Sequence, residues 1–104
     1  MNGRYILDGH MPVPCDELLQ WAKAMETDRH VGNDTIGDAQ VSTVFLGLDH
    51  SFHGGPPILF ETMVFGSEFG KWERRYCTWE EAEAGHREIV AAIKAGTAPS
   101  EEPA

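Results

Sequence analysis

The sequence predicts a small α+β domain: an antiparallel meander of four to five strands with two helices, in the order β-α-β-β-β-β-α. Three strand-like segments, residues 40–49, 58–65 and 71–77, follow one another with glycine-containing connections between them. One helical pattern precedes this run and a second follows it. Sequential strands joined by short connections pair antiparallel, and the helices are then expected to pack on the sheet.

The N-terminal part predicts one strand and one helix. Tyr5, Ile6 and Leu7 form a short strand candidate, whereas Pro12 and Pro14 lack the amide that regular pairing needs and predict a loop. The helix ends near residue 27, and acidic side chains at its start suit the positive end of a helix. The acids are Asp16 and Glu17, and the apolar stripe is Leu18, Trp21, Ala22 and Met25.

The middle of the chain predicts the meander itself. Residues 31–36 form a weak strand, and Gly37-Asp38 reads as the turn that follows it. Residues 40–49 and 58–65 are strong strands separated by a loop with a Gly-Gly-Pro-Pro run, and residues 66–70 form a hairpin turn before the last strand.

Both alternate sets of residues in the two strong strands are largely apolar. An antiparallel strand with one wet face alternates apolar with polar residues, so this pattern predicts that both faces of the sheet are covered. The N-terminal segment or another subunit would cover the second face, and we therefore expect a homo-oligomer. The sets are Val41 and Phe45 against Val44, Leu46 and Leu48, then Ile58, Phe60 and Val64 against Leu59, Met63 and Phe65.

The last helix has the clearest signals. Thr78 and Glu81 form a capping box, and Gly96 suits the C-terminal end. His86 lies on the apolar stripe of this helix and is predicted to be a core histidine. We expect residues 1–96 to form one domain and residues 97–104 an acidic disordered tail. The stripe is Trp79, Ala82, His86, Ile89, Val90 and Ile93.

The charge and the cysteine content limit the partners and the cellular compartment that we expect for this protein. The net charge is −9, from 17 acidic and 8 basic residues, which argues against coating a nucleic-acid polymer or an anionic membrane. Cys15 and Cys77 lack metal-ligand spacing and indicate free thiols in a reducing compartment. With no signal peptide or apolar span in the sequence, the expected location is cytoplasmic. No cofactor is expected.

A polar loop follows the first strong strand. Asp49, His50 and His53 could ligate a metal, but two histidines three residues apart are a weak pattern, and an aspartate-headed turn with exposed histidines explains it better. We therefore expect no metal. The adjoining Gly54 and Gly55 lack the ending of a phosphate loop.

A second group of candidate residues lies on the later strands. Glu61 and Thr62 interrupt an apolar strand, so the carboxylate either forms a salt bridge, to Arg4, Arg74 or Arg75, or contacts a ligand. Arg74 and Arg75 point to opposite faces of their strand. One of them could hold a phosphate or carboxylate beside stacking surfaces from Trp72 and Tyr76, although ordinary cross-strand packing would also explain these residues.

Four runs that span nearly the whole chain resemble a family of small phage and prophage proteins. The resemblance implies a phage setting, in which small acidic proteins antagonise host defence by sequestering nucleotide-derived signals or by mimicking DNA. If phage-encoded, the chain would act in the host cytoplasm. The runs are GRYILDG at residues 3–9, VSTVFLGLDH at 41–50, LFETMVFG at 59–66 and YCTWEEA at 76–82.

These observations favour an oligomeric binding protein that sequesters a small anionic, nucleotide-like ligand. A protein-interaction inhibitor or acidic mimic is the first alternative, and a small enzyme using Asp49, His50 and Glu61 is the second. The expected ligand contacts are Arg74 or Arg75 to phosphate, Trp72 and Tyr76 to a base, Glu61 or Thr62 to a ribose, and His50, Gly54 and Gly55 as further hydrogen-bonding groups.

Overall fold

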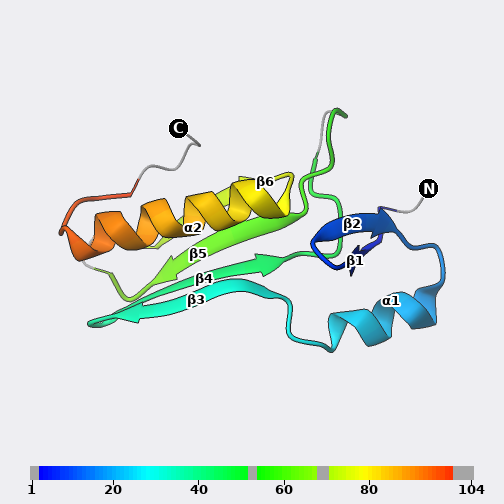
Figure 1. Ribbon diagram of the computed structural model, residues 1–104, viewed down its shortest axis with the longest axis horizontal. Coiled ribbons are helices and arrows are strands. Elements are labelled where there is room, and N and C mark those ends of the chain that lie inside the picture. Colours follow the sequence, from blue (N-terminus) through cyan, green and yellow to red (C-terminus); the bar gives the residue numbers. More distant parts are fainter. Residues whose placement is uncertain (1–2, 52–53, 68–70, 100–104) are drawn as a thin grey trace.

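A computed structural model describes residues 3–51, 54–67 and 71–99 of the chain. A four-stranded antiparallel sheet with one long helix forms the larger part, and a two-stranded hairpin with a short helix forms a smaller part beside it (Figure 1). The molecule is elongated, with extents of 44 × 28 × 21 Å. The predicted α+β class with a meander sheet is confirmed, in the order β-β-α-β-β-β-β-α.

The sheet has the strand order β3-β4-β5-β6, and each strand is antiparallel to the next. Neither helix in the described ranges is long and apolar enough to cross a membrane. The elements are β1 (Tyr5–Asp8), β2 (Met11–Pro14), α1 (Leu18–Met25), β3 (His30–Ile36), β4 (Ala39–Phe45), β5 (Phe60–Phe65), β6 (Trp72–Tyr76) and α2 (Trp79–Lys94).

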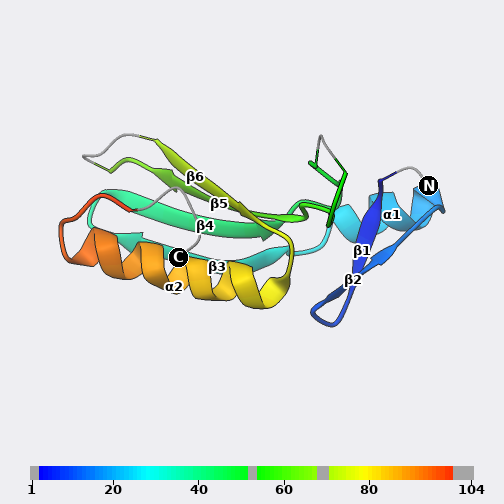
Figure 2. The same ribbon diagram turned by 90° about the horizontal axis from the view of Figure 1, so that it is seen from above.

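Helix α2 covers one face of the four-stranded sheet and leaves the other open (Figure 2). In β4 the residues under the helix are fully buried, whereas those between them are exposed or partly exposed. This is the alternation of a strand with one wet face. The buried set is Val41, Thr43 and Phe45 of β4 with Phe60, Thr62 and Val64 of β5.

The expectation that the N-terminal segment covers the second face of the sheet was wrong, whereas cover by a second subunit stays a prediction. Strand β4 ends at Phe45 and β5 begins at Phe60, so Leu46 and Leu48 belong to the connection between them. The N-terminal segment packs beyond the end of the sheet and not over its open face (Figure 2). The open face carries Val44, Met63 and Phe65 among polar neighbours.

The prediction that Pro12 and Pro14 lie in a loop was also wrong. Both belong to β2, which pairs antiparallel with β1 through the register Ile6 with Val13 and Leu7 with Pro12. The prolines are alternate residues, so both missing amides point to the same side of the strand. That side is the outer edge, where a strand tolerates proline.

Gly47 joins the small part of the molecule to the large one. Its carbonyl accepts hydrogen bonds from the Tyr5 amide at 2.9 Å and from Nε1 of Trp21 at 3.0 Å. Its φ is +78°, and a Cβ at this position would collide with the side chain of Met25. The chain therefore turns out of β4 at this residue and runs beside β1, where Leu48 pairs with Arg4.

Helix α1 packs mainly on β1, and Met25 at its end reaches the core cluster around Phe45. The prediction that both helices pack on the four-stranded sheet is therefore confirmed only for α2. Glu17 caps it by accepting a hydrogen bond from the Leu19 amide at 3.3 Å. None of its eight residues is buried. We call residues 3–27, the hairpin and this helix, the N-terminal unit.

Helix α2 begins as predicted. Thr78 Oγ1 accepts a hydrogen bond from the Glu81 amide at 3.1 Å, and the Glu81 carboxylate accepts one from the Thr78 amide at 3.1 Å. This capping box is confirmed. Of the predicted tail, the amide of Thr97 donates to the carbonyl of Ala92 at 2.9 Å, and residues 100–104 lie outside the described ranges.

We expect Gly47→Ala to lower the free energy of unfolding by about 2–5 kcal/mol, because it adds a left-handed backbone cost to a clash with Met25. Gly9→Ala is the matched control, since Gly9 also has a positive φ, of +62°, but has open space around a new Cβ. It should cost only about 1–2 kcal/mol. Urea unfolding of both variants measures the difference, and equal losses would contradict the proposed packing at Gly47.

Candidate ligand-binding site

The predicted ligand residues on β6 lie beneath helix α2. Arg74 and Tyr76 are each 4% exposed, and Trp72 packs against the core on the same face. Nη1 of Arg74 donates to a carboxylate oxygen of Glu88 on α2 at 3.2 Å. These side chains therefore join the sheet to the helix and do not line an open pocket.

Arg75 lies on the opposite, open face of the sheet. Its Nε donates to Glu61 at 2.9 Å, directly across from it on β5. Of the partners considered for Glu61 from the sequence, the structure thus selects Arg75. Because Glu61 and Arg75 point away from Thr62 and Arg74, these four residues do not converge on one ligand.

Thr62 belongs to a buried chain of hydroxyl groups that ends at a histidine. Its Oγ1 lies 3.0 Å from the Tyr76 hydroxyl and 2.5 Å from Oγ1 of Thr43, which in turn lies 2.7 Å from Nδ1 of His86. Gly85 on α2 leaves room for the Tyr76 ring. Burial raises the pKa of Tyr76, which keeps the hydroxyl protonated.

The buried chain continues in an order that resembles a catalytic triad, with Thr43 in the place of the nucleophile, His86 in that of the base and Asp34 in that of the acid. This arrangement was not recognisable from the sequence. Thr43 is 0% exposed, however, and no described hollow contains it. Nε2 of His86 is 3.6 Å from the Asp34 carboxylate, too long for a hydrogen bond. The arrangement is therefore a core polar network, and His86 is the core histidine that its position on the stripe predicts.

The polar loop after β4 is organised around Asp49. Its Oδ1 accepts hydrogen bonds from the amides of Ser51 at 2.8 Å and Ile58 at 3.0 Å, and these bonds lower the pKa of the carboxyl group. Gly54 and Gly55 are exposed with positive φ angles. Asp49 thus acts as the head of a turn.

The residues that the sequence suggested for catalysis already make hydrogen bonds that hold the fold together. The carboxylates of Asp49 and Glu61 hold a loop and a cross-strand arginine, and His50 uses its amide to bond the carbonyl of Ile58. Within the described residues, no group of three metal-ligating side chains comes together. His53 lies outside the described ranges.

A hollow of about 290 Å³ lies between the β1–β2 turn and the start of α2. We call it the hairpin hollow. The rings of His10 and Trp79 stack beside it, with centroids 3.8 Å apart and planes inclined by 5°. This contact ties the tip of the hairpin to the helix. The lining residues are Asp8, His10, Met11, Pro12, Thr78, Trp79 and Glu80.

The hairpin hollow combines flat, polar and charged groups. The amides of Trp79 and Glu80 belong to the first turn of α2, where amides lack partners within the helix and the dipole is positive. The carboxylates of Asp8 and Glu80 supply hydrogen-bond acceptors. Nε1 of Trp79 is buried without a hydrogen-bond partner among the described residues.

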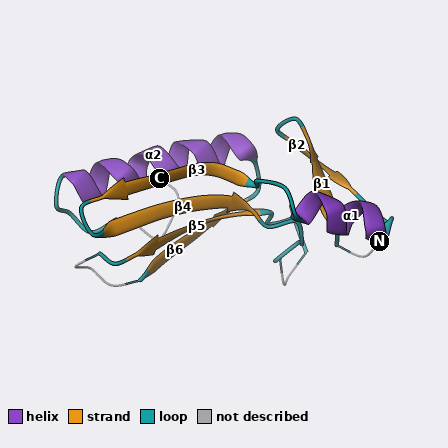
Figure 3. Ribbon diagram, turned by 90° about the horizontal axis from the view of Figure 1, so that it is seen from below, coloured by secondary structure: helices purple, strands orange, loops and turns teal. Residues whose placement is uncertain are grey.

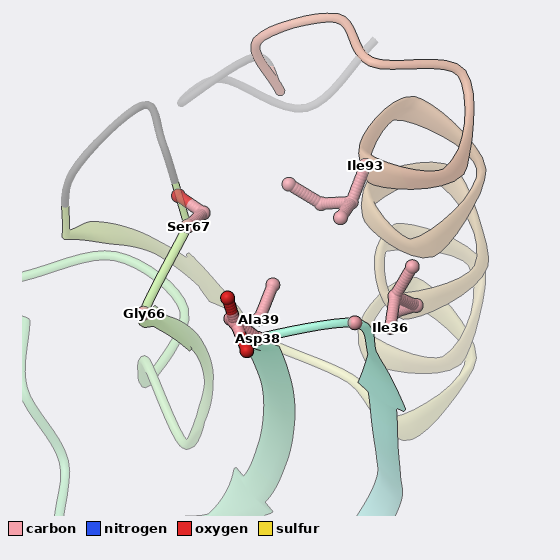
Figure 4. Close-up of a pocket in the computed structure, with 7 residues that line it drawn as sticks. Ile36, Asp38, Ala39, Gly66, Ser67 and Ile93 are labelled. Carbon is pink, nitrogen blue, oxygen red and sulfur yellow. The ribbon is translucent and has the colours of Figure 1, made fainter.

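A second hollow, of about 240 Å³, lies at the far end of the sheet. Ile36 and Ile93 border it, and the Ser67 hydroxyl and Asp38 supply its polar side chains (Figure 4). None of the described residues that line it is aromatic or basic. The hairpin hollow is therefore the stronger candidate site.

Comparisons with protein-family models, curated proteins and solved structures found no match. The case for a site therefore depends on geometry alone. Sequence reasoning missed the hairpin hollow because the prolines of β2 indicated a loop. Two signals were available, a Gly-His pair flanked by short extended segments and a tryptophan directly after a helix cap, but only the tertiary fold brings them together.

The protein should lose stability below pH 6.5 in a way that depends on His86. Burial lowers the pKa of His86 below its ordinary 6.5, and the nearby Asp34 only partly opposes this. The unfolded chain therefore takes up the proton first, and the stabilisation present above pH 6.5 is lost as the pH falls towards the lower, folded-state pKa.

His86→Asn is the control variant, because its amide can still reach Thr43 but does not titrate. The loss of unfolding free energy between pH 7.5 and pH 5.0 should be smaller in this variant than in the wild type. Denaturant unfolding at both pH values measures it, and identical pH profiles would rule out a buried neutral His86.

Proposed function

We propose that this chain is a small binding protein that holds a nucleotide-like ligand in the hairpin hollow. The observation that carries the proposal is the parallel stack of His10 and Trp79 beside the first turn of α2. Flat rings stack on aromatic side chains, and the N-terminal end of a helix attracts negative charge. A nucleotide-like molecule presents both groups.

The lining of the hairpin hollow supplies a partner for each part of such a ligand. A base would lie against the outer face of the exposed His10 ring, which Trp79 supports from behind. Carboxylates commonly accept hydrogen bonds from ribose hydroxyls, and Asp8 or Glu80 would take this role. A phosphate would face the amides of Trp79 and Glu80.

The charge of the protein restricts the ligand. Two carboxylates line the hairpin hollow and the chain carries a net charge of −9, so each further phosphate adds repulsion. The volume, about 290 Å³, is at the lower end for ligand pockets. Both arguments favour a nucleoside, a monophosphate or a cyclic monophosphate over a triphosphate.

This proposal keeps the ligand class expected from the sequence and changes the residues that bind it. Arg74, Arg75 and Glu61 are engaged in ion pairs of the sheet. A protein that binds such a ligand without converting it lowers the free concentration of the ligand. That outcome fits the signal-sequestering role that the phage resemblance implies.

Thermal-shift screening followed by calorimetric titration with nucleosides, monophosphates, cyclic monophosphates and triphosphates tests the proposal. We expect His10→Ala to weaken binding by roughly 5- to 150-fold, the effect of losing one stacking contact of about 1–3 kcal/mol. The free energy of unfolding should fall by only about 0.5–1.5 kcal/mol, the value of one aromatic stacking pair, because His10 is otherwise exposed.

His30→Ala is the matched control. His30 is an exposed histidine too, but it pairs with Asp28 at 2.8 Å and lies outside the hairpin hollow. It should bind ligand like the wild type. A panel without a shift for the wild type, or equal binding by His10→Ala, would contradict the proposed site.

A further inference from the structure

The polar side chains around the hairpin hollow are mainly hydrogen-bond acceptors. Asp8 and Glu80 contribute carboxylates, which accept hydrogen bonds and donate none. The Thr78 hydroxyl is already used by the capping box of α2, and Nε1 of Trp79 is buried. Apart from the ring of His10, the described lining supplies no other polar side chain. A ligand that brings its own donors therefore suits the rim of this hollow.

Asp8 and His10 are held close together by one tight turn. Strand β1 ends at Asp8 and β2 begins with its partner Met11, so only Gly9 and His10 lie between the two strands. Gly9 has a φ of +62°, the sign that a type II′ hairpin turn requires of its first central residue. Cross-strand partners lie about 5 Å apart, and both Asp8 and His10 line the same hollow. A ring stacked on His10 therefore has one edge within reach of the Asp8 carboxylate.

Among the common bases, guanine has the edge that matches a carboxylate. Its Watson–Crick edge places two donors, N1–H and the N2 amino group, side by side, and the two oxygens of one carboxylate can accept both. Adenine and cytosine each present one donor beside an acceptor, and uracil presents one donor between two acceptors. An acceptor that faces another acceptor is left without a hydrogen bond, which costs binding free energy.

We propose that the nucleotide-like ligand of the hairpin hollow carries guanine, and that Asp8 is the residue that selects it. This inference rests on the proposed function, because it assigns the base of the ligand that the hollow would hold. The base stacks on His10 while its N1 and N2 groups donate to Asp8. Glu80 is left for the ribose, since its own amide lies at the phosphate end, in the first turn of α2.

Calorimetric titration with the 5′-monophosphates of guanosine, inosine and adenosine tests the base. All three are purine nucleotides with the same phosphate, so stacking and charge are closely matched and the edge of the base differs. The wild type should bind the guanine nucleotide roughly 10- to 100-fold more tightly than the adenine nucleotide, the discrimination of one bidentate pair. The inosine nucleotide keeps N1–H but lacks the N2 amino group, and its affinity should lie between the other two.

Asp8→Asn tests the residue. The new side chain has nearly the same shape but presents a donor beside an acceptor, so the ratio of guanine to adenine affinity should fall to about one or reverse. Asp38→Asn is the matched control, because it removes the same charge from an exposed aspartate that borders the second hollow. It should keep the wild-type ratio.

The outcomes separate this inference from the proposed function. Equal affinity of the wild type for guanine and adenine nucleotides, with both weakened by His10→Ala, would overturn the guanine assignment and leave the proposed site standing. A guanine preference that survives Asp8→Asn would overturn the role of Asp8. Absence of binding by all three nucleotides would contradict the proposed function itself, and this inference with it.

Discussion

The structure depends on one carbonyl group, that of Gly47. Two donors from different elements, the Tyr5 amide and the Trp21 indole, bond to it, and the missing Cβ lets Met25 pack directly on the backbone. The N-terminal unit is attached to the meander sheet here. The same turn ends β4, sends Leu48 to pair with Arg4, and brings the hairpin tip within stacking distance of Trp79. The hairpin hollow is a consequence of this junction.

The second constraint is polar and lies within the core. Helix α2 crosses the sheet above Thr43, Thr62 and Tyr76, whose hydroxyl groups form a hydrogen-bonded chain that ends at Nδ1 of His86 on the helix. Gly32 allows the His86 ring to lie directly on β3. Figure 3 shows α2 running alongside that strand. Apolar side chains on both sides of this network exclude water. A buried network of this kind fixes the position of a helix more narrowly than apolar contacts do, because each bond requires a defined geometry.

The sequence predicted those parts of the fold that local patterns determine. The capping box at Thr78 identified α2, and the consecutive strand-like segments with glycine-containing connections identified the meander, because both signals act over a few residues. The second hairpin strand was missed, since proline excludes a strand only when its nitrogen faces a partner, and the sequence does not show which side that is. The candidate ligand residues on β6 were identified by type, but their burial under α2 is a tertiary property. The hairpin hollow joins positions 8 to 12 with 78 to 80, a proximity that no local pattern indicates.

The attachment of β1 to residues 47–49 also bears on the order in which the chain folds during synthesis. The hairpin and α1 leave the ribosome first, yet the segment that anchors them follows some twenty residues after α1 ends. Until Gly47 emerges, the hairpin has only local contacts, and an isolated two-stranded hairpin is marginally stable. The meander, whose neighbouring strands are close in sequence, can form without it. The N-terminal unit, although it precedes the sheet in the chain, is therefore expected to reach its native position only after Gly47 has emerged, and to contact Trp79 only once α2 has been made.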